Sequence, residues 1–152
     1  MGRIFRTVRG FEQIRLLEES LSPSLEDYLE MIFRKTNSEE DLRLGDLADL
    51  LHVSAASATK NVQRLANLGF VSYEPYGKIK LTDLGKKTGE VLLARHETIE
   101  RFFRVLGVGE IGFEETEMIE HYLSEATVKK LNILTAFLEK QNDEWQEFSE
   151  NQ

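Results

Sequence analysis

Residues 54–70 read SAASATKNVQRLANLGF, and this stretch decides the fold. Ser54 is a residue type that caps helix N-termini, and Gly69 is the type that most often follows a last helical turn. Between them lies a stripe of apolar residues at helical spacing: Ala58, Val62 and Leu65. The preceding run, residues 41–53, places five leucines on a helix-like pattern and ends in a break. Together the two segments predict a helix-turn-helix.

The second of these helices carries side chains suited to a DNA groove. Small residues near its start allow close approach to base edges, and its longer polar and basic residues reach bases or phosphates. Residues 70–73 and 78–81 are β-prone runs on either side of a turn with proline and glycine, which predicts a hairpin wing. The alternative for this hairpin is a solvated basic surface. The residues expected to contact double-stranded DNA are Ser54, Ala55, Ala56, Ser57, Thr59, Lys60, Gln63, Arg64, Lys78 and Lys80.

Charge is distributed unevenly along the chain. The formal net charge is −8, which by itself disfavours a nucleic-acid partner. Residues 54–87, however, hold six basic and two acidic side chains, whereas residues 108–152 hold three lysines and eleven acids. A basic middle and an acidic end predict that two parts of the chain have different roles.

Cysteine is absent from the 152 residues, which excludes disulfides, zinc–thiolate sites and thiol nucleophiles. The first 20 residues carry charges throughout and have no long apolar core. We therefore expect neither a signal peptide nor a membrane span, and a cytoplasmic location by default.

Three further helices are predicted, near residues 25–35, 83–106 and 127–140, so the expected fold class is mostly α. Apolar residues cover much of the circumference of the longest one, which predicts burial against a second subunit. We expect a partly ordered or disordered extension over residues 1–21, a winged helix-turn-helix domain over residues 22–88, and a helical metal-binding and dimerisation domain over residues 89–152.

Acidic residues and a histidine recur at helical spacing near the end of the chain. Residues 113–125 are expected to form a helix, and Glu117, Glu120 and His121 would then share one face. Two carboxylates and an imidazole could form half of a metal site or an ordinary solvated face. Asp27 and Glu30 are likewise three residues apart, and their simpler interpretation is that they complement the dipole of a helix start.

Residues 22–141 resemble the diphtheria-toxin-repressor family of metal-activated repressors, and most closely its manganese-transport-regulator branch. The segments that carry the resemblance are PSLEDYLE at 23–30, SATKNVQRL at 57–65, LTDLGKK at 81–87, RHE at 95–97 and EMIEHYLS at 117–124. In that branch the metal ligands fall at positions matching Asp27, Glu30, His96, Glu117, Glu120 and His121. The iron-responsive branch has methionine and cysteine in place of Asp27 and Glu117, and the chain is too short for the SH3-like domain of longer members.

The resemblance implies a homodimeric repressor, not an enzyme, that binds operator DNA when Mn²⁺ is bound and so controls metal-uptake genes. Four carboxylates and two imidazoles suit Mn²⁺, with two ions expected per subunit and Fe²⁺, Cd²⁺ or Zn²⁺ as substitutes. Three other classes are weighed from the residues themselves. A winged-helix regulator could respond to Fe²⁺ or to a small organic ligand, and a dinuclear metallohydrolase could use similar ligands. The third, a purely structural dimer module, would lack the basic recognition helix.

Overall fold

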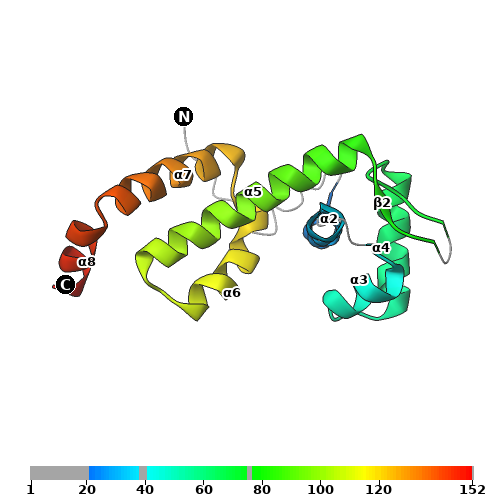
Figure 1. The fold of residues 1–152 in the computed structure, drawn as a ribbon, viewed down its shortest axis with the longest axis horizontal. Helices are drawn as coiled ribbons and strands as arrows, with labels where there is room; N and C mark the ends of the chain where they lie inside the picture. Colours follow the sequence, from blue (N-terminus) through cyan, green and yellow to red (C-terminus); the bar gives the residue numbers. More distant parts are fainter. Residues whose placement is uncertain (1–20, 38–40, 75–76, 152) are drawn as a thin grey trace, which may run out of the picture. The chain divides into compact units, whose positions relative to one another are not determined.

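The computed structural model describes residues 21–37, 41–74 and 77–151. The described residues form two compact units that divide between residues 90 and 91, and Figure 1 shows the helices and strands of both. The boundary lies within the long helix α5 (Asp83–Leu106). The extension expected over residues 1–21 falls almost entirely outside the described residues. Among those that are described, no helix is long and apolar enough to cross a membrane.

The first unit contains α2 (Pro23–Asn37), α3 (Leu44–Leu50), α4 (Ala55–Asn67), the strands β1 (Val71–Ser72) and β2 (Lys80–Leu81), and the first turns of α5. Ser22 caps α2, because its Oγ accepts a hydrogen bond from the amide of Leu25 at 3.4 Å. The core of the unit is aliphatic and includes Leu25, Leu29, Ile32, Leu47, Val62 and Leu65, each fully buried.

The helix-turn-helix prediction is confirmed. Ser54 caps α4 by accepting a hydrogen bond from the Ser57 amide at 3.2 Å, and Ala58, Val62 and Leu65 are the buried residues of the helix. Gly69 follows α4 with φ of 82°, a left-handed conformation that glycine adopts without strain. The first helix of the motif is shorter than the predicted run, since α3 spans Leu44–Leu50.

The wing is an antiparallel hairpin whose strands have two residues each, with Val71 opposite Leu81 and Ser72 opposite Lys80. Its second strand leads directly into α5, and Thr82 joins the two. The Thr82 hydroxyl donates to the carbonyl of Gly69 at 2.6 Å and accepts from the Gly85 amide at 3.0 Å. A Cβ at Gly85 would lie 1.9 Å from the Phe70 carbonyl oxygen, so glycine is required there.

The second unit contains the remainder of α5, α6 (Glu110–Ile119), the 3₁₀ turn η1 (Glu120–Tyr122), α7 (Glu125–Lys140) and α8 (Asn142–Glu150). Arg101 of α5 donates to Asn132 of α7 at 2.8 Å and pairs with Glu139 at 3.1 Å. Trp145 of α8 donates its indole N–H to the Val105 carbonyl at 3.0 Å and so links α8 to α5. Phe148 of α8 is 60% exposed.

One prediction for the end of the chain is wrong. The helix expected over residues 113–125 ends at Ile119, because η1 follows and Ser124 caps a new helix by accepting from the Thr127 amide at 3.2 Å. On α7, Leu134 is 44% exposed whereas Thr135 is fully buried. The start of α7 is therefore marked by the N-cap residue Ser124, which apolar periodicity alone does not indicate.

Candidate metal centre

A buried histidine and a buried glutamate form the centre of a polar cluster in the second unit. His96 lies on α5 and Glu120 is the first residue of η1. Their side chains are 3% and 1% exposed, and His96 Nδ1 lies 2.8 Å from Glu120 Oε2. Burial of a carboxylate costs free energy unless it is hydrogen-bonded or bound to a cation, and the contact with His96 offsets this cost for Glu120.

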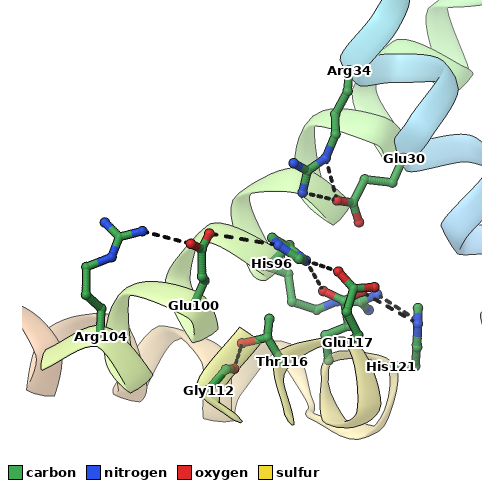
Figure 2. A network of polar contacts seen from close by, with 11 residues as sticks. Glu30, Arg34, His96, Glu100, Arg104, Gly112, Thr116, Glu117 and His121 are labelled. Carbon is green, nitrogen blue, oxygen red and sulfur yellow. Dashed lines mark hydrogen bonds and ion pairs between the residues drawn. The ribbon is translucent and has the colours of Figure 1, made fainter. Parts of the chain in front are cut away.

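Two more of the residues matched by the resemblance surround this pair (Figure 2). Glu117 Oε1 is 3.6 Å from His96 Nδ1, and the Glu117 side chain is 49% exposed. His121 Nε2 is 3.6 Å from the second oxygen of Glu120, and His121 is buried. Glu117 belongs to the last turn of α6, whereas Glu120 and His121 belong to the 3₁₀ turn. The structure thus gathers His96, Glu117, Glu120 and His121 without the continuous helix that the sequence suggested.

Asp27 and Glu30 lie on α2 in the first unit. Because α2 begins at Pro23, the acidic residue of its first turn is Glu26, and the other two come later. Their simpler interpretation as acids complementing a helix start therefore does not hold, since that effect fades beyond the first turn. Glu30 is 7% exposed, and its Oε1 accepts hydrogen bonds from Arg34 Nε at 2.9 Å and from Arg34 Nη2 at 2.5 Å.

Sequence reasoning missed three residues that contact the matched positions: Arg34 beside Glu30, Glu100 beside His96 and Arg95 beside His121. Glu100, one turn after His96 on α5, places Oε2 3.9 Å from His96 Nε2, and its Oε1 accepts from Arg104 at 2.8 Å. Arg95 Nη2 lies 3.4 Å from His121 Nδ1. The i, i+4 spacing of His96, Glu100 and Arg104 was the available signal, because such residues share one helix face.

Carboxylates and imidazoles without thiols are the donor set that suits a hard or borderline divalent cation. One ring nitrogen of His96 faces the carboxylates of η1 and α6, while the other faces Glu100. Histidines that bind metals commonly have their second nitrogen oriented in this way by a carboxylate. The edge of the Phe113 ring lies against His96, with 6.2 Å between centroids. The residues present therefore fit a Mn²⁺-type ion on chemical grounds.

The predicted DNA-contacting residues lie mostly on the surface of the first unit. Those exposed are Ser54, Ala55, Ala56, Lys60, Gln63, Arg64, Lys78 and Lys80, while Ser57 and Thr59 are half-buried. The Thr59 hydroxyl already donates to the Ala55 carbonyl at 2.7 Å, and the Lys78 ammonium pairs with Asp41. A hollow of about 500 Å³ beside α4 is lined by Thr59, Gln63 and, among residues the sequence reasoning missed, Arg43 and Tyr73.

Family models match both units of the chain. Residues 20–79 match the iron-dependent repressor N-terminal DNA-binding domain, and residues 82–147 match the metal-binding and dimerisation domain of the same family. The chain belongs to the iron-dependent repressor family. Members of this family are DNA-binding transcriptional regulators and not enzymes. The mostly α architecture with a helix-turn-helix domain and a metal-binding domain is thereby confirmed.

Relatives within the iron-dependent repressor family include manganese regulators. The chain is 37% identical over 123 residues to the HTH-type transcriptional regulator MntR of Bacillus pumilus strain SAFR-032, covering 80% of this chain and 85% of that protein. This identity confirms the resemblance to the manganese branch.

Solved structures share the fold. A manganese-dependent transcriptional repressor in complex with manganese is 28% identical with a TM-score of 0.62, over 74% of this chain and 53% of that one. The manganese regulator SloR is 23% identical with a TM-score of 0.59, over 77% of this chain and 55% of that one. The chain thus spans just over half the length of these two structures.

Proposed function

We propose that this protein is a manganese-responsive transcriptional repressor that binds operator DNA as a homodimer and controls metal-uptake genes. The observation that carries the proposal is the buried pair of His96 and Glu120, 2.8 Å apart, with Glu117 and His121 beside it. These donors lie in the part of the chain that matches the family's metal-binding domain. The similar solved structure of a manganese-dependent transcriptional repressor in complex with manganese supports Mn²⁺ as the ion.

The proposed ligands are Asp27, Glu30, His96, Glu117, Glu120 and His121. With four carboxylates available to bridge, we propose two ions per subunit, with Fe²⁺, Cd²⁺ and Zn²⁺ as competitors. The Irving–Williams order makes Mn²⁺ the weakest-bound of the first-row divalent ions, so selectivity must come from coordination number and geometry. The absence of thiol and thioether donors at positions 27 and 117 works in that direction, because soft donors favour other metals.

The switch would be a linkage between metal and DNA. Two of the six proposed ligands belong to the DNA-binding unit and four to the other unit. An ion that takes ligands from both sets favours one arrangement of the DNA-binding units in a dimer, and so one spacing of the two α4 helices on successive major-groove half-sites. Such coupling is typically about 1–3 kcal/mol, and by reciprocity DNA must strengthen Mn²⁺ binding equally.

On the DNA side, we propose that α4 lies in the major groove and that Lys78 and Lys80 of the wing contact the phosphate backbone. Lys60, Gln63 and Arg64 are exposed on α4 and long enough to reach bases or phosphates. Ser54, Ala55, Ala56, Ser57 and Thr59 form the small-residue start of the helix. Since phosphate contacts dominate affinity, binding should weaken steeply with salt.

Dimerisation is supported by the exposed apolar side chains of the second unit. The large ones are Val91, Val108, Ile111, Phe113, Met118, Tyr122, Ile133, Leu134, Phe137 and Phe148. Apolar side chains that are exposed in one chain are available for contact with another chain. We propose that a second copy covers part of it. A repressor acts on the chromosome, so we place the protein in the cytoplasm.

The test is operator binding measured by fluorescence anisotropy, with genomic fragments upstream of metal-transporter genes as probes. Affinity should rise at least fivefold on addition of Mn²⁺ and fall again with EDTA, and Glu120→Gln should remove the response. A parallel titration with Fe²⁺ identifies the preferred ion. DNA affinity that is the same with Mn²⁺ and with EDTA would exclude the proposed function and would favour a regulator of another ligand class.

A further inference from the structure

Arg34 holds the carboxylate of Glu30, one turn earlier on α2 (Figure 2). Two guanidinium nitrogens, Nε at 2.9 Å and Nη2 at 2.5 Å, donate to the same oxygen, Glu30 Oε1. The Glu30 side chain is 9% exposed, whereas that of Arg34 is 38% exposed. The charge of a nearly desolvated carboxylate is therefore compensated by a cation that belongs to the same helix.

This ion pair differs from an ordinary surface pair because the carboxylate of Glu30 is nearly buried. An exposed i, i+4 pair contributes little, but removing the partner of a buried charge leaves that charge uncompensated. Glu30 is also one of the proposed Mn²⁺ ligands, so the same carboxylate is offered to two cations. Any ion that binds Glu30 must either displace the guanidinium or share the carboxylate with it.

We propose that Arg34 is a built-in competitor that weakens Mn²⁺ binding and so sets the metal concentration at which the repressor responds. The inference rests on the proposed function, because it requires Glu30 to be a ligand. Displacement of Arg34 costs the hydrogen bonds to Glu30 Oε1. Coexistence leaves a unit positive charge one carboxylate away from a divalent ion. Both routes lower metal affinity, and both are relieved when the residue loses its charge.

The opposite role for Arg34 is that of a positioning residue. Ligating carboxylates are often hydrogen-bonded by a second residue that orients them and strengthens metal binding. The two roles predict opposite changes in Mn²⁺ affinity when the charge is removed. They also predict opposite changes in how strongly Mn²⁺ stabilises the fold.

The experiment compares wild type with Arg34→Gln, Arg34→Lys and Lys129→Gln. Lys129→Gln is the matched control, because it removes the same charge and also an i, i+4 ion pair, the pair with Glu125 on α7. Mn²⁺ affinity is measured by isothermal titration calorimetry and by the loss of the free-ion electron paramagnetic resonance signal. The melting temperature is measured with EDTA and with saturating Mn²⁺.

For Arg34→Gln we expect Mn²⁺ to bind about three- to tenfold more tightly. This range corresponds to the Coulomb attraction between the guanidinium and the Glu30 carboxylate, which the ion no longer has to overcome, in a water-like medium with and without salt screening. The metal-free protein should melt lower, because the Glu30 carboxylate loses the two hydrogen bonds from the guanidinium, and the rise in melting temperature caused by Mn²⁺ should be larger. Arg34→Lys and Lys129→Gln should both stay within twofold of wild type.

Equal or weaker Mn²⁺ binding by Arg34→Gln, with a smaller rise in melting temperature, would overturn the inference and assign a positioning role. If Lys129→Gln also binds Mn²⁺ more tightly, the increase in affinity is explained by the change in net charge, and this result would also overturn the inference. If the wild-type protein itself binds no Mn²⁺, the proposed function fails, and that outcome is distinct from an unchanged affinity in the variant.

Discussion

Glu100→Ala should weaken Mn²⁺ binding although Glu100 is not a proposed ligand. Glu100 lies one turn after His96, with its Oε2 3.9 Å from His96 Nε2, while His96 Nδ1 faces Glu120 and Glu117. Its carboxylate is fixed from the other side by Arg104 at 2.8 Å. Without it, the His96 ring loses a group that orients it.

Removal of such an outer carboxylate typically costs tenfold to a hundredfold in metal affinity. A 3.9 Å separation is longer than a hydrogen bond and the Glu100 side chain is 35% exposed, so we expect the lower end, about tenfold or 1.4 kcal/mol. Arg104→Ala should cost less, about twofold to threefold, because Arg104 acts only through Glu100 and is 72% exposed.

The assay is calorimetric titration with Mn²⁺, with Glu97→Ala as the matched control. Glu97 is an exposed neighbour of His96 on α5, and its substitution by alanine removes the same charge from the same helix. Both variants should keep the wild-type melting temperature in EDTA within a few degrees. An equal loss of affinity in Glu97→Ala would show a general charge effect, and an unchanged affinity in Glu100→Ala would refute the reasoning.

Two further predictions concern stability. Gly85→Ala should destabilise the first unit by about 3 kcal/mol, because the new Cβ would lie 1.9 Å from the Phe70 carbonyl oxygen. Gly45→Ala is the control and should be neutral or stabilising, because nothing lies within 4 Å of its Cβ. Urea unfolding measures both variants, and equal unfolding midpoints would contradict the close approach at Gly85. Hydrogen bonding to Lys129, and then its charge, hold the pKa of the exposed Glu125 carboxyl below its ordinary value. The contribution of Glu125 to stability is therefore present above its unfolded pKa and is lost as pH falls through the lower, folded one. Titration followed by nuclear magnetic resonance should show this pKa return to its ordinary value in Lys129→Gln, and no change there would mean that another group is responsible.

Local signals in the sequence were sufficient for the DNA-binding unit. The ends of α4 depend on Ser54 and Gly69, and its buried face depends on the spacing of Ala58, Val62 and Leu65, all within one short segment. Caps and periodicity are properties of neighbouring residues, so they can be read without knowledge of the rest of the fold.

The metal centre was less accessible to the same reasoning. His96 and Glu120 are 24 residues apart, and no periodicity connects them. Their pairing was inferred from a family resemblance. The apolar and acidic pattern continues across the break between α6 and η1, so periodicity does not reveal it, and the local signal for the next helix start is the cap at Ser124. Arg34 lies four residues after Glu30, and Glu100 lies four residues after His96, so the sequence places each on the same helix face as a matched residue. The structure is needed to show that the side chains of each pair lie close together.

The junction at Thr82 has a mechanical consequence. Its amide and hydroxyl hold the carbonyls of Phe70 and Gly69, and its hydroxyl also holds the first turn of α5 through the Gly85 amide. With Gly85 pressed against Phe70, the joint between hairpin and helix has little freedom to bend. A torque applied to the start of α5 is then passed on to the wing and to the end of α4 together. With α4 and the wing contacting DNA as proposed, the two contacts would form or break together and not one after the other.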